Sequence, residues 1–203
     1  LGQPVPAVSR TGGGGAVGYS YVNATDPDGY NIVWNSNSIS TAHHFGNIEF
    51  DYEAFEPIAM VSQEVPVMAV RAGTEWQTLE DMVEWSRETG QRLRVGHAGV
   101  GSFTHLTAAA LFDRLDLEVN FIPYGEGREV AELLAGRIDT AMRWPSEFIP
   151  HAESGDLHVV CGTGPERLAS LPETPTCDEL GASGMVMTMW RGLAAPKGTP
   201  PEV

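Results

Sequence analysis

Residues 95–112, with the sequence VGHAGVGSFTHLTAAALF, constrain what this chain can fold into more than any other segment. The pattern predicts a short strand, a glycine turn and then a helix. The apolar side of the helix is expected to be Phe103, Leu106 and Ala110, which are spaced i, i+3 and i+7. A strand, a tight turn and a helix in this order are typical of an α/β protein.

The turn in this segment has the features of an anion site. Ser102 is expected to cap the helix, because its hydroxyl can accept a hydrogen bond from an amide of the first turn. Gly99 and Gly101 allow the backbone to approach a bound molecule closely. The turn would then present free N–H groups at the positive end of the helix dipole. The alternative is a tight connection that binds nothing.

Composition limits the class of partner. The chain has 203 residues, of which 42% are hydrophobic, enough to bury a core as one large domain or two small ones. With 27 acidic and 12 basic residues the formal net charge is −15. A surface this acidic repels nucleic acid and anionic lipid at long range, so we expect no nucleic-acid partner. An anionic ligand would have to be attracted locally, by amide dipoles and a few arginines.

A second glycine pattern, GxGxxG, lies at Gly13, Gly15 and Gly18 after a strand-like segment. A nucleotide-binding α/β enzyme domain would use such glycines to seat a pyrophosphate, with an acidic residue about 20 positions further on. The next predicted strand, residues 31–34, ends instead at Asn35 and Ser36. We therefore favour a structural turn into a helix and expect no cofactor. The motifs GxSxG, HExxH and the P-loop do not occur, which argues against a hydrolase.

The two cysteines, Cys161 and Cys177, lie on either side of a proline-rich loop. A disulfide in an oxidising compartment and two buried thiols both fit this arrangement. No Cys/His zinc spacing occurs, and we expect no metal.

Eight segments of the chain, in order and at similar spacing, carry a resemblance to a known family. They are SRTGGGGAVG (9–18), DPDGYNIVWNS (26–36), FEPIAMVSQEVPVMAV (55–70), GVGSFTHL (99–106), FIPYGEG (121–127), ELLAGRIDTAM (132–142), LASLPETPTCDELG (168–181) and RGLAAPKGTP (191–200). The chain resembles the periplasmic solute receptors of tripartite tricarboxylate transporters, the TctC or Bug family.

The resemblance implies an α/β fold of the periplasmic binding protein type II kind, with two lobes and a ligand cleft between them, truncated at both ends. Lobe 1 would comprise residues 1–72 and 177–203, and lobe 2 residues 73–176. The protein would be a monomeric, non-enzymatic receptor for a small carboxylate, such as a di- or tricarboxylate. Membrane permease subunits would be its partners. It would lie in the periplasm, or tethered outside a Gram-positive cell, with its signal peptide outside residues 1–203.

Together, the resemblance and the residue types predict the ligand contacts. The carboxylate would be held by amides around residues 99–102, helped by Ser102 and Thr104, and from the other lobe by Ser36, Asn37 and Ser38. His105 is expected to shape the loop, and contact with the ligand is the alternative.

Two further candidates follow predicted strands. Tyr124 would either stack on or hydrogen-bond a ligand, or anchor its turn. Arg143 would offer a bidentate fork to a second carboxylate, unless it pairs with one of the many acidic side chains of the chain.

Overall fold

The computed structural model describes residues 2, 4–124 and 127–203. The chain divides into two compact units, a smaller one of Leu1–Gln63 with Trp190–Val203 and a larger one of Glu64–Met189. These boundaries differ from the predicted lobes, because residues 64–72 and 177–189 lie in the larger unit. The first of these segments contains a strand of the larger sheet, and the second begins at a cysteine that is bonded to another strand of that sheet.

Strands and helices alternate along much of the chain, as the predicted α/β fold implies. The strands are β1 (Val33–Ser36), β2 (Phe55–Glu64), β3 (Val67–Arg71), β4 (Arg94–His97), β5 (Asn120–Pro123), β6 (Thr140–Arg143), β7 (Leu157–Gly162) and β8 (Met189–Pro196). The α-helices are α1 (Ala16–Asn23), α2 (Ser38–His44), α3 (Leu79–Thr89), α4 (Phe103–Arg114), α5 (Glu129–Leu134) and α6 (Pro145–Glu153), and the short 3-10 turns are η1 (Gly13–Gly15) and η2 (Tyr52–Ala54). No helix in the described part of the chain is both long and apolar enough to cross a membrane.

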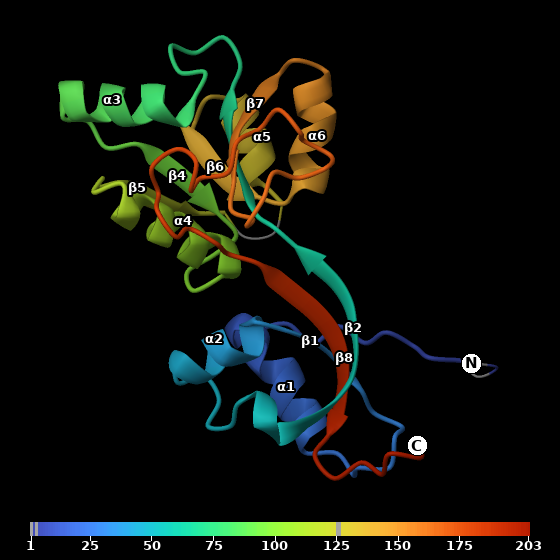
Figure 1. Cartoon of the computed structure of the whole chain (residues 1–203). Coiled ribbons are helices and arrows are strands. Elements are labelled where there is room, and N and C mark those ends of the chain that lie inside the picture. Colours follow the sequence, from blue (N-terminus) through green and yellow to red (C-terminus); the bar gives the residue numbers. More distant parts are fainter. Residues whose placement is uncertain (1, 3, 125–126) are drawn as a thin grey trace. The chain divides into compact units, whose positions relative to one another are not determined.

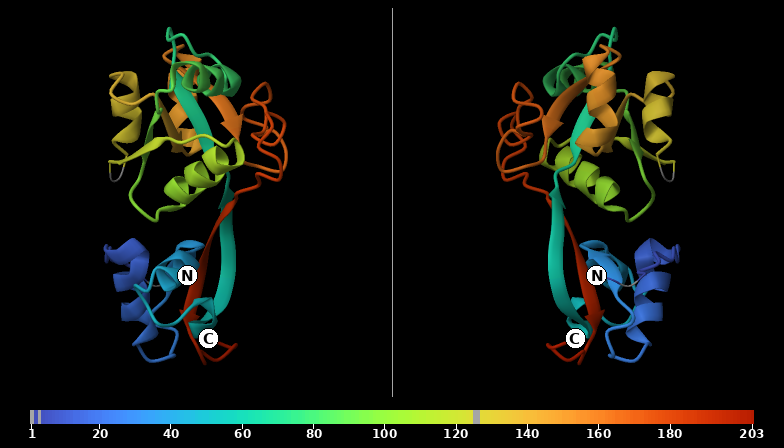
Figure 2. Two further views of the ribbon diagram at one scale, coloured as in Figure 1. Left: turned by 90° about the vertical axis from the view of Figure 1, so that its left-hand side faces the viewer. Right: turned by 90° about the vertical axis from the view of Figure 1, so that its right-hand side faces the viewer.

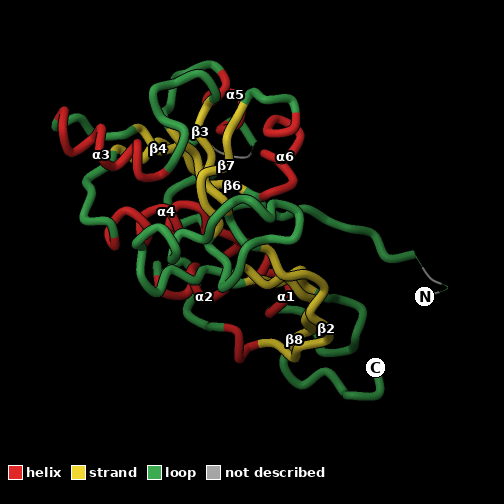
Figure 3. Tube along the Cα trace, turned by 45° about the horizontal axis from the view of Figure 1, so that its top comes forward, coloured by secondary structure: helices red, strands yellow, loops and turns green. Residues whose placement is uncertain are grey.

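The smaller unit is built on a three-stranded sheet in the order β1-β8-β2 (Figures 1 and 3). Strand β8 pairs antiparallel with β1, from Val33 opposite Ala194 to Ser36 opposite Arg191. Its approach to β2 requires a glycine at position 192, where a Cβ atom would lie 2.6 Å from a carbonyl oxygen of β2. Buried side chains of α1, α2 and the strands, among them Tyr19, Ile39 and Phe55, form the core of this unit.

The larger unit is a five-stranded sheet in the order β5-β4-β6-β3-β7, with helices on both faces (Figures 1 and 2). Successive residues of β3 point to opposite faces. Met68 and Val70 pack in one cluster with α3 and α4, whereas Val67 and Ala69 pack in another with α5 and α6. Both faces of the sheet are therefore buried, and its strands are short and apolar.

The sheet of the larger unit is mixed. β4 is parallel to β5 and β6, but β3 is antiparallel to β6 and β7. β4, β5 and β6 follow one another through the helices α4 and α5 and run in the same direction. β3 runs in the opposite direction, although the helix α3 lies between it and β4. The carboxyl ends of β5, β4 and β6, which are adjacent in the sheet, consequently meet at one edge.

The buried face of α4 differs from the predicted one. Thr104, Thr107, Ala108 and Leu111 are buried, whereas Phe103 and the other two predicted core residues of this helix are only partly buried. Two threonines can face the core because their hydroxyls are satisfied locally: the Thr107 hydroxyl donates to the Phe103 carbonyl oxygen at 2.7 Å. The pattern of apolar residues alone could not reveal this.

The two cysteines form a disulfide, which decides between the alternatives that the sequence leaves open. Cys161 in β7 and Cys177 are both fully buried, and their Cα atoms lie 5.1 Å apart. The amide of Cys177 also donates to the Gly162 carbonyl oxygen at 2.8 Å. The bridge therefore fastens the proline-rich loop to the edge of the larger sheet.

Candidate functional site

The site begins at the loop between β4 and α4. Ser102 caps α4 as predicted, and its hydroxyl oxygen accepts a hydrogen bond from the amide of His105 at 3.2 Å. Gly99 has φ 150° and Gly101 has φ 77°, both in a region that favours glycine. A side chain at either position would strain the turn that aims the N-terminus of α4.

Several of the loop amides already donate hydrogen bonds within the loop, contrary to the expectation of free N–H groups. The amide of Ala98 donates to the Thr104 hydroxyl oxygen at 3.2 Å, and that of Ser102 donates to the Gly99 carbonyl oxygen at 3.1 Å. The Ser102 and Thr104 hydroxyls also lie 3.2 Å apart. Helix geometry leaves the amides of the first two residues of α4, Phe103 and Thr104, without an intrahelical acceptor, so an anion is expected at those amides.

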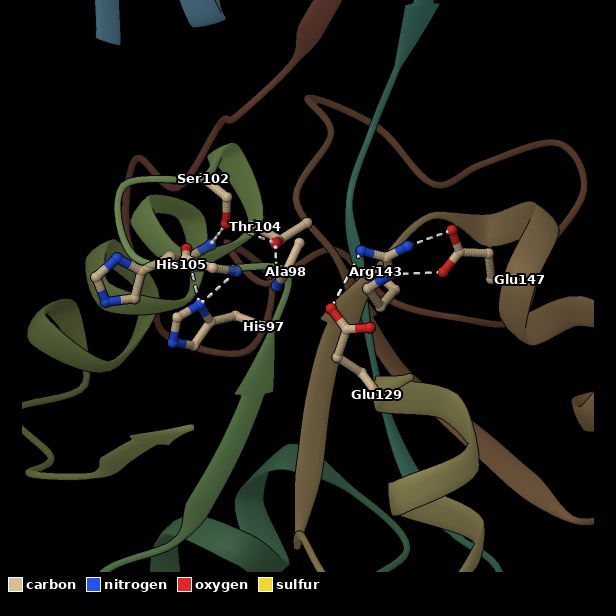
Figure 4. Close-up of polar contacts among 9 residues, drawn as sticks. His97, Ala98, Ser102, Thr104, His105, Glu129, Arg143 and Glu147 are labelled. Carbon is tan, nitrogen blue, oxygen red and sulfur yellow. Dashed lines mark hydrogen bonds and ion pairs between the residues drawn. The ribbon is translucent and has the colours of Figure 1, made fainter. Parts of the chain in front are cut away.

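Two histidines hold the loop in place from within the protein. His105 Nδ1 accepts the amide of Gly101 at 3.2 Å, so this histidine shapes the loop as expected. His97 Nδ1 lies 3.0 Å from the Gly99 carbonyl oxygen and 3.2 Å from the Gly99 amide. The two rings are stacked with centroids 4.3 Å apart, and the ring of Phe121 meets both at its edge. Figure 4 shows the contacts of His97 with the loop.

Sequence reasoning missed His97, which is only 1% exposed at the end of β4. Its Nε2 atom is buried without a hydrogen-bond partner among the described residues. Burial lowers the pKa of His97, and the charge of the neighbouring His105 lowers it further. Burial also lowers the pKa of His105. Both rings are therefore neutral at pH 7, as the hydrogen bond from Gly101 to His105 Nδ1 requires.

Residues that follow the two neighbouring strands lie beside this loop. Tyr124 comes directly after β5, and its amide donates to the His97 carbonyl oxygen at 3.0 Å, so its backbone anchors the turn. Arg143 is the last residue of β6, and the next residue, Trp144, stacks on Phe103 of α4 with ring centroids 6.3 Å apart. The aromatic pair next to the helix N-terminus has no counterpart in the sequence predictions.

Arg143 does not present an open fork. Its Nε and Nη2 atoms donate to the two carboxylate oxygens of Glu147 at 2.5 and 2.6 Å, and its Nη1 atom to Glu129 at 3.2 Å (Figure 4). Its side chain is 9% exposed. The structure therefore favours the alternative of an arginine paired within the chain. A ligand carboxylate could reach the fork only by displacing Glu147.

The three polar candidates of the smaller unit take part in hydrogen bonds within that unit. The Ser36 hydroxyl accepts the amide of Ser38 at 3.2 Å, at the start of α2. The side-chain oxygen of Asn37 accepts the amide of Trp190 in β8 at 2.9 Å. Their contact with a ligand stays a prediction.

The pattern Gly13, Gly15 and Gly18 does not form a dinucleotide-binding turn. Residues 4–12 contain no strand, and they lead into η1, where Gly14 has φ 65° and ψ 27°. A dinucleotide fold requires a strand immediately before the glycine turn. The pattern therefore serves as the turn into α1, which is the interpretation that the sequence favours.

Together, the fold and the loop define an α/β protein whose larger unit carries a capped helix N-terminus at the end of a strand. The comparisons with known proteins place it more narrowly. The model of the tripartite tricarboxylate transporter family receptor, TctC, matches residues 1–203. The chain belongs to this family, which confirms the resemblance found in the sequence.

The similar proteins agree with this assignment. A UPF0065 protein of the TAR-I ttuE-ttuC' intergenic region of Agrobacterium vitis is 30% identical over the whole of this chain, which spans 60% of that protein's length. A TctC solute-binding protein from Polaromonas, solved without ligand, is 31% identical with a TM-score of 0.79 over 96% of this chain and 67% of its own. The predicted α/β fold of a solute receptor is thereby confirmed.

Two more distant structures share the fold. MatC from Rhodopseudomonas palustris with bound malate is 24% identical and has a TM-score of 0.80, covering 94% of this chain and 66% of its own. A second R. palustris protein, solved with adipate, is also 24% identical and has a TM-score of 0.83, covering 95% of this chain and 66% of its own.

Proposed function

We propose that this protein is the substrate receptor of a tripartite tricarboxylate-type transporter and binds a small organic carboxylate, of which di- and tricarboxylates are one class. The observation that carries the proposal is the N-terminus of α4, which Ser102 caps at the carboxyl end of β4. The malate and adipate of the two more distant structures support the same class of ligand.

The binding mechanism follows from the local charges. The chain carries a formal net charge of −15, so its surface as a whole repels an anion. The attraction must come from the first two amides of α4 and the helix dipole, aided by the hydroxyls of Ser102 and Thr104. The stacked histidines keep the loop in the conformation that aims these groups. Ser36, Asn37 and Ser38 are proposed as ligand contacts on the smaller unit.

We further propose that the ligand is carried unchanged to membrane permease subunits by a monomeric receptor. The family's role in transport supports this inference, as does the absence of a recognised catalytic motif in the sequence. A location in the periplasm, or tethered outside a Gram-positive cell, agrees with the buried disulfide, because such bonds persist in oxidising compartments.

The proposal is tested by thermal unfolding of the protein at its natural length with mono-, di- and tricarboxylates. A bound ligand stabilises the folded state by RT ln(1 + [L]/Kd), about 2.7 kcal/mol at a hundredfold excess over Kd. The controls are nucleotides and the amide analogues of the same acids. Stabilisation by a carboxylate but not by its amide supports the proposal, and recovery of the unchanged acid supports a non-enzymatic role. Stabilisation by a nucleotide alone would contradict the proposal.

A further inference from the structure

The ion cluster of Arg143, Glu129 and Glu147 contains more negative than positive groups. Glu147 lies in the first turn of α6, four residues after Arg143, and binds the guanidinium with both oxygens. Glu129 is the first residue of α5 and is fully buried, and its Oε2 atom has no hydrogen-bond partner among the described residues. One cation faces two carboxyl groups, so the cluster has no excess positive charge to offer.

The protonation of Glu129 does not change this conclusion. Burial raises the pKa of Glu129, while hydrogen bonds to the backbone and the charge of Arg143 act in the opposite direction. With Glu129 ionised the cluster carries a net charge of −1. With Glu129 protonated it is neutral, because Glu147 still balances Arg143.

The cluster adjoins the proposed carboxylate site. Arg143 ends β6, which runs parallel to β4 with Gly96 opposite Ala141, so both strands deliver the chain to the same edge of the sheet. The residue after Arg143 stacks on Phe103, the first residue of α4. A ligand held at the N-terminus of α4 therefore has this cluster as a near neighbour. Figure 4 shows the loop and the cluster together.

We infer that Glu147 determines which ligand charge the larger unit accepts at this edge. Because Glu147 fills the fork of Arg143, the larger unit selects a ligand with one carboxylate and rejects a second carboxylate at the carboxyl end of β6. The inference rests on the proposed function. A second carboxylate reaching the carboxyl end of β6 would lose water and meet two carboxyl groups instead of an open guanidinium. An uncharged polar or apolar group in the same place avoids this cost.

The test compares acids that differ in one charge. Succinate and adipate are each measured against their half-amides, succinamic and adipamic acid, by calorimetric titration of the protein at its natural length. For the wild type we expect each half-amide to bind at least as tightly as its diacid. Glu147→Gln removes one carboxylate and weakens the hydrogen bonds that occupy the Arg143 guanidinium. We therefore expect it to shift the ratio of affinities toward the diacid by about tenfold, the usual worth of a hydrogen bond to a charged group.

Glu153→Gln is the matched control, because Glu153 is exposed at the end of the same helix and the substitution changes the net charge equally. It should leave the ratio unchanged. If Glu147→Gln fails to fold, Glu147→Asp is used, because it withdraws the carboxylate by one methylene and should shift the ratio in the same direction.

The outcomes separate the inference from the proposed function. A wild type that prefers the diacids tenfold or more, or a ratio that Glu147→Gln leaves unmoved, overturns the inference alone. The inference is also wrong if none of the four acids binds to either protein. The proposed function fails only if no carboxylate of the whole panel binds.

Discussion

Two substitutions of Ser102 separate the cap of α4 from the charge at its N-terminus. Asn and Asp are as good as Ser at an N-cap, so Ser102→Asn and Ser102→Asp should both keep the hydrogen bond that the hydroxyl now accepts from His105 at 3.2 Å. The two variants differ by one negative charge at the proposed anion site. We expect their unfolding free energies to lie within about 1 kcal/mol of each other.

Ligand affinity should respond very differently. The carboxylate that Ser102→Asp introduces would lie roughly 4 Å from a ligand carboxylate held by the first amides of the helix. Two like charges at that distance repel by about 1 kcal/mol in water and about 4 kcal/mol at an effective dielectric constant of about 20. The expected loss of affinity relative to Ser102→Asn is therefore between about fivefold and about a thousandfold.

Calorimetric titration with the best carboxylate of the panel measures this difference, and thermal unfolding without ligand measures stability. Ser102→Ala is a third variant, which should lose about 1 kcal/mol of stability because it lacks the cap. Equal carboxylate affinity in the Asp and Asn variants, with both folded, would refute the placement of the anion at this helix.

Three other perturbations have defined outcomes. The pKa values of His97 and His105 are lowered below the unfolded value of about 6.5, so their contribution to stability is present above that pH and is lost as the pH falls through the lowered values. The melting temperature should therefore fall less steeply between pH 7 and 5 in His105→Asn than in the wild type. An equal fall in both proteins would contradict a lowered pKa of His105. Reduction of the Cys161–Cys177 bridge, sixteen residues apart in sequence, should cost about 3 kcal/mol in urea unfolding, and an unchanged midpoint would count against a structural role. Gly192→Ala should destabilise the protein by about 1–3 kcal/mol, because its methyl group would lie 2.6 Å from a carbonyl oxygen of β2, and unchanged thermal unfolding would show that this contact relaxes freely.

Several features of the site could be predicted because they depend on residues close together in the chain. The cap by Ser102 joins positions three apart, and the left-handed glycines follow from the turn itself. The capping box at the start of α3, between Thr78 and Asp81, follows from the same kind of spacing and is present. In each case the interacting groups are neighbours in sequence, so no knowledge of the fold is needed.

The state of Arg143 depended on packing. One partner, Glu147, is four residues away and could have been found as a helical pair, but the other, Glu129, belongs to a different helix, α5. The position of Arg143 at a strand end suggested a ligand contact, yet the sequence does not say which acids converge on the same strand end. The same holds for Trp144, which meets Phe103 only because β4 and β6 are neighbours in the sheet.

By itself, the sequence determined the family, the alternation of strands and helices, and the loop that leads into a capped helix, because these are set by local spacing and by motifs in a fixed order. Only the tertiary structure decided which polar groups of the loop and its neighbours remain available to a ligand. It buries His97 under the loop, uses the amides of Ala98 and Gly101 within the site, and fills the fork of Arg143. The physical reason is that each polar group forms hydrogen bonds and ion pairs with the groups that folding places next to it. The order of the strands in the sheet decides which groups those are.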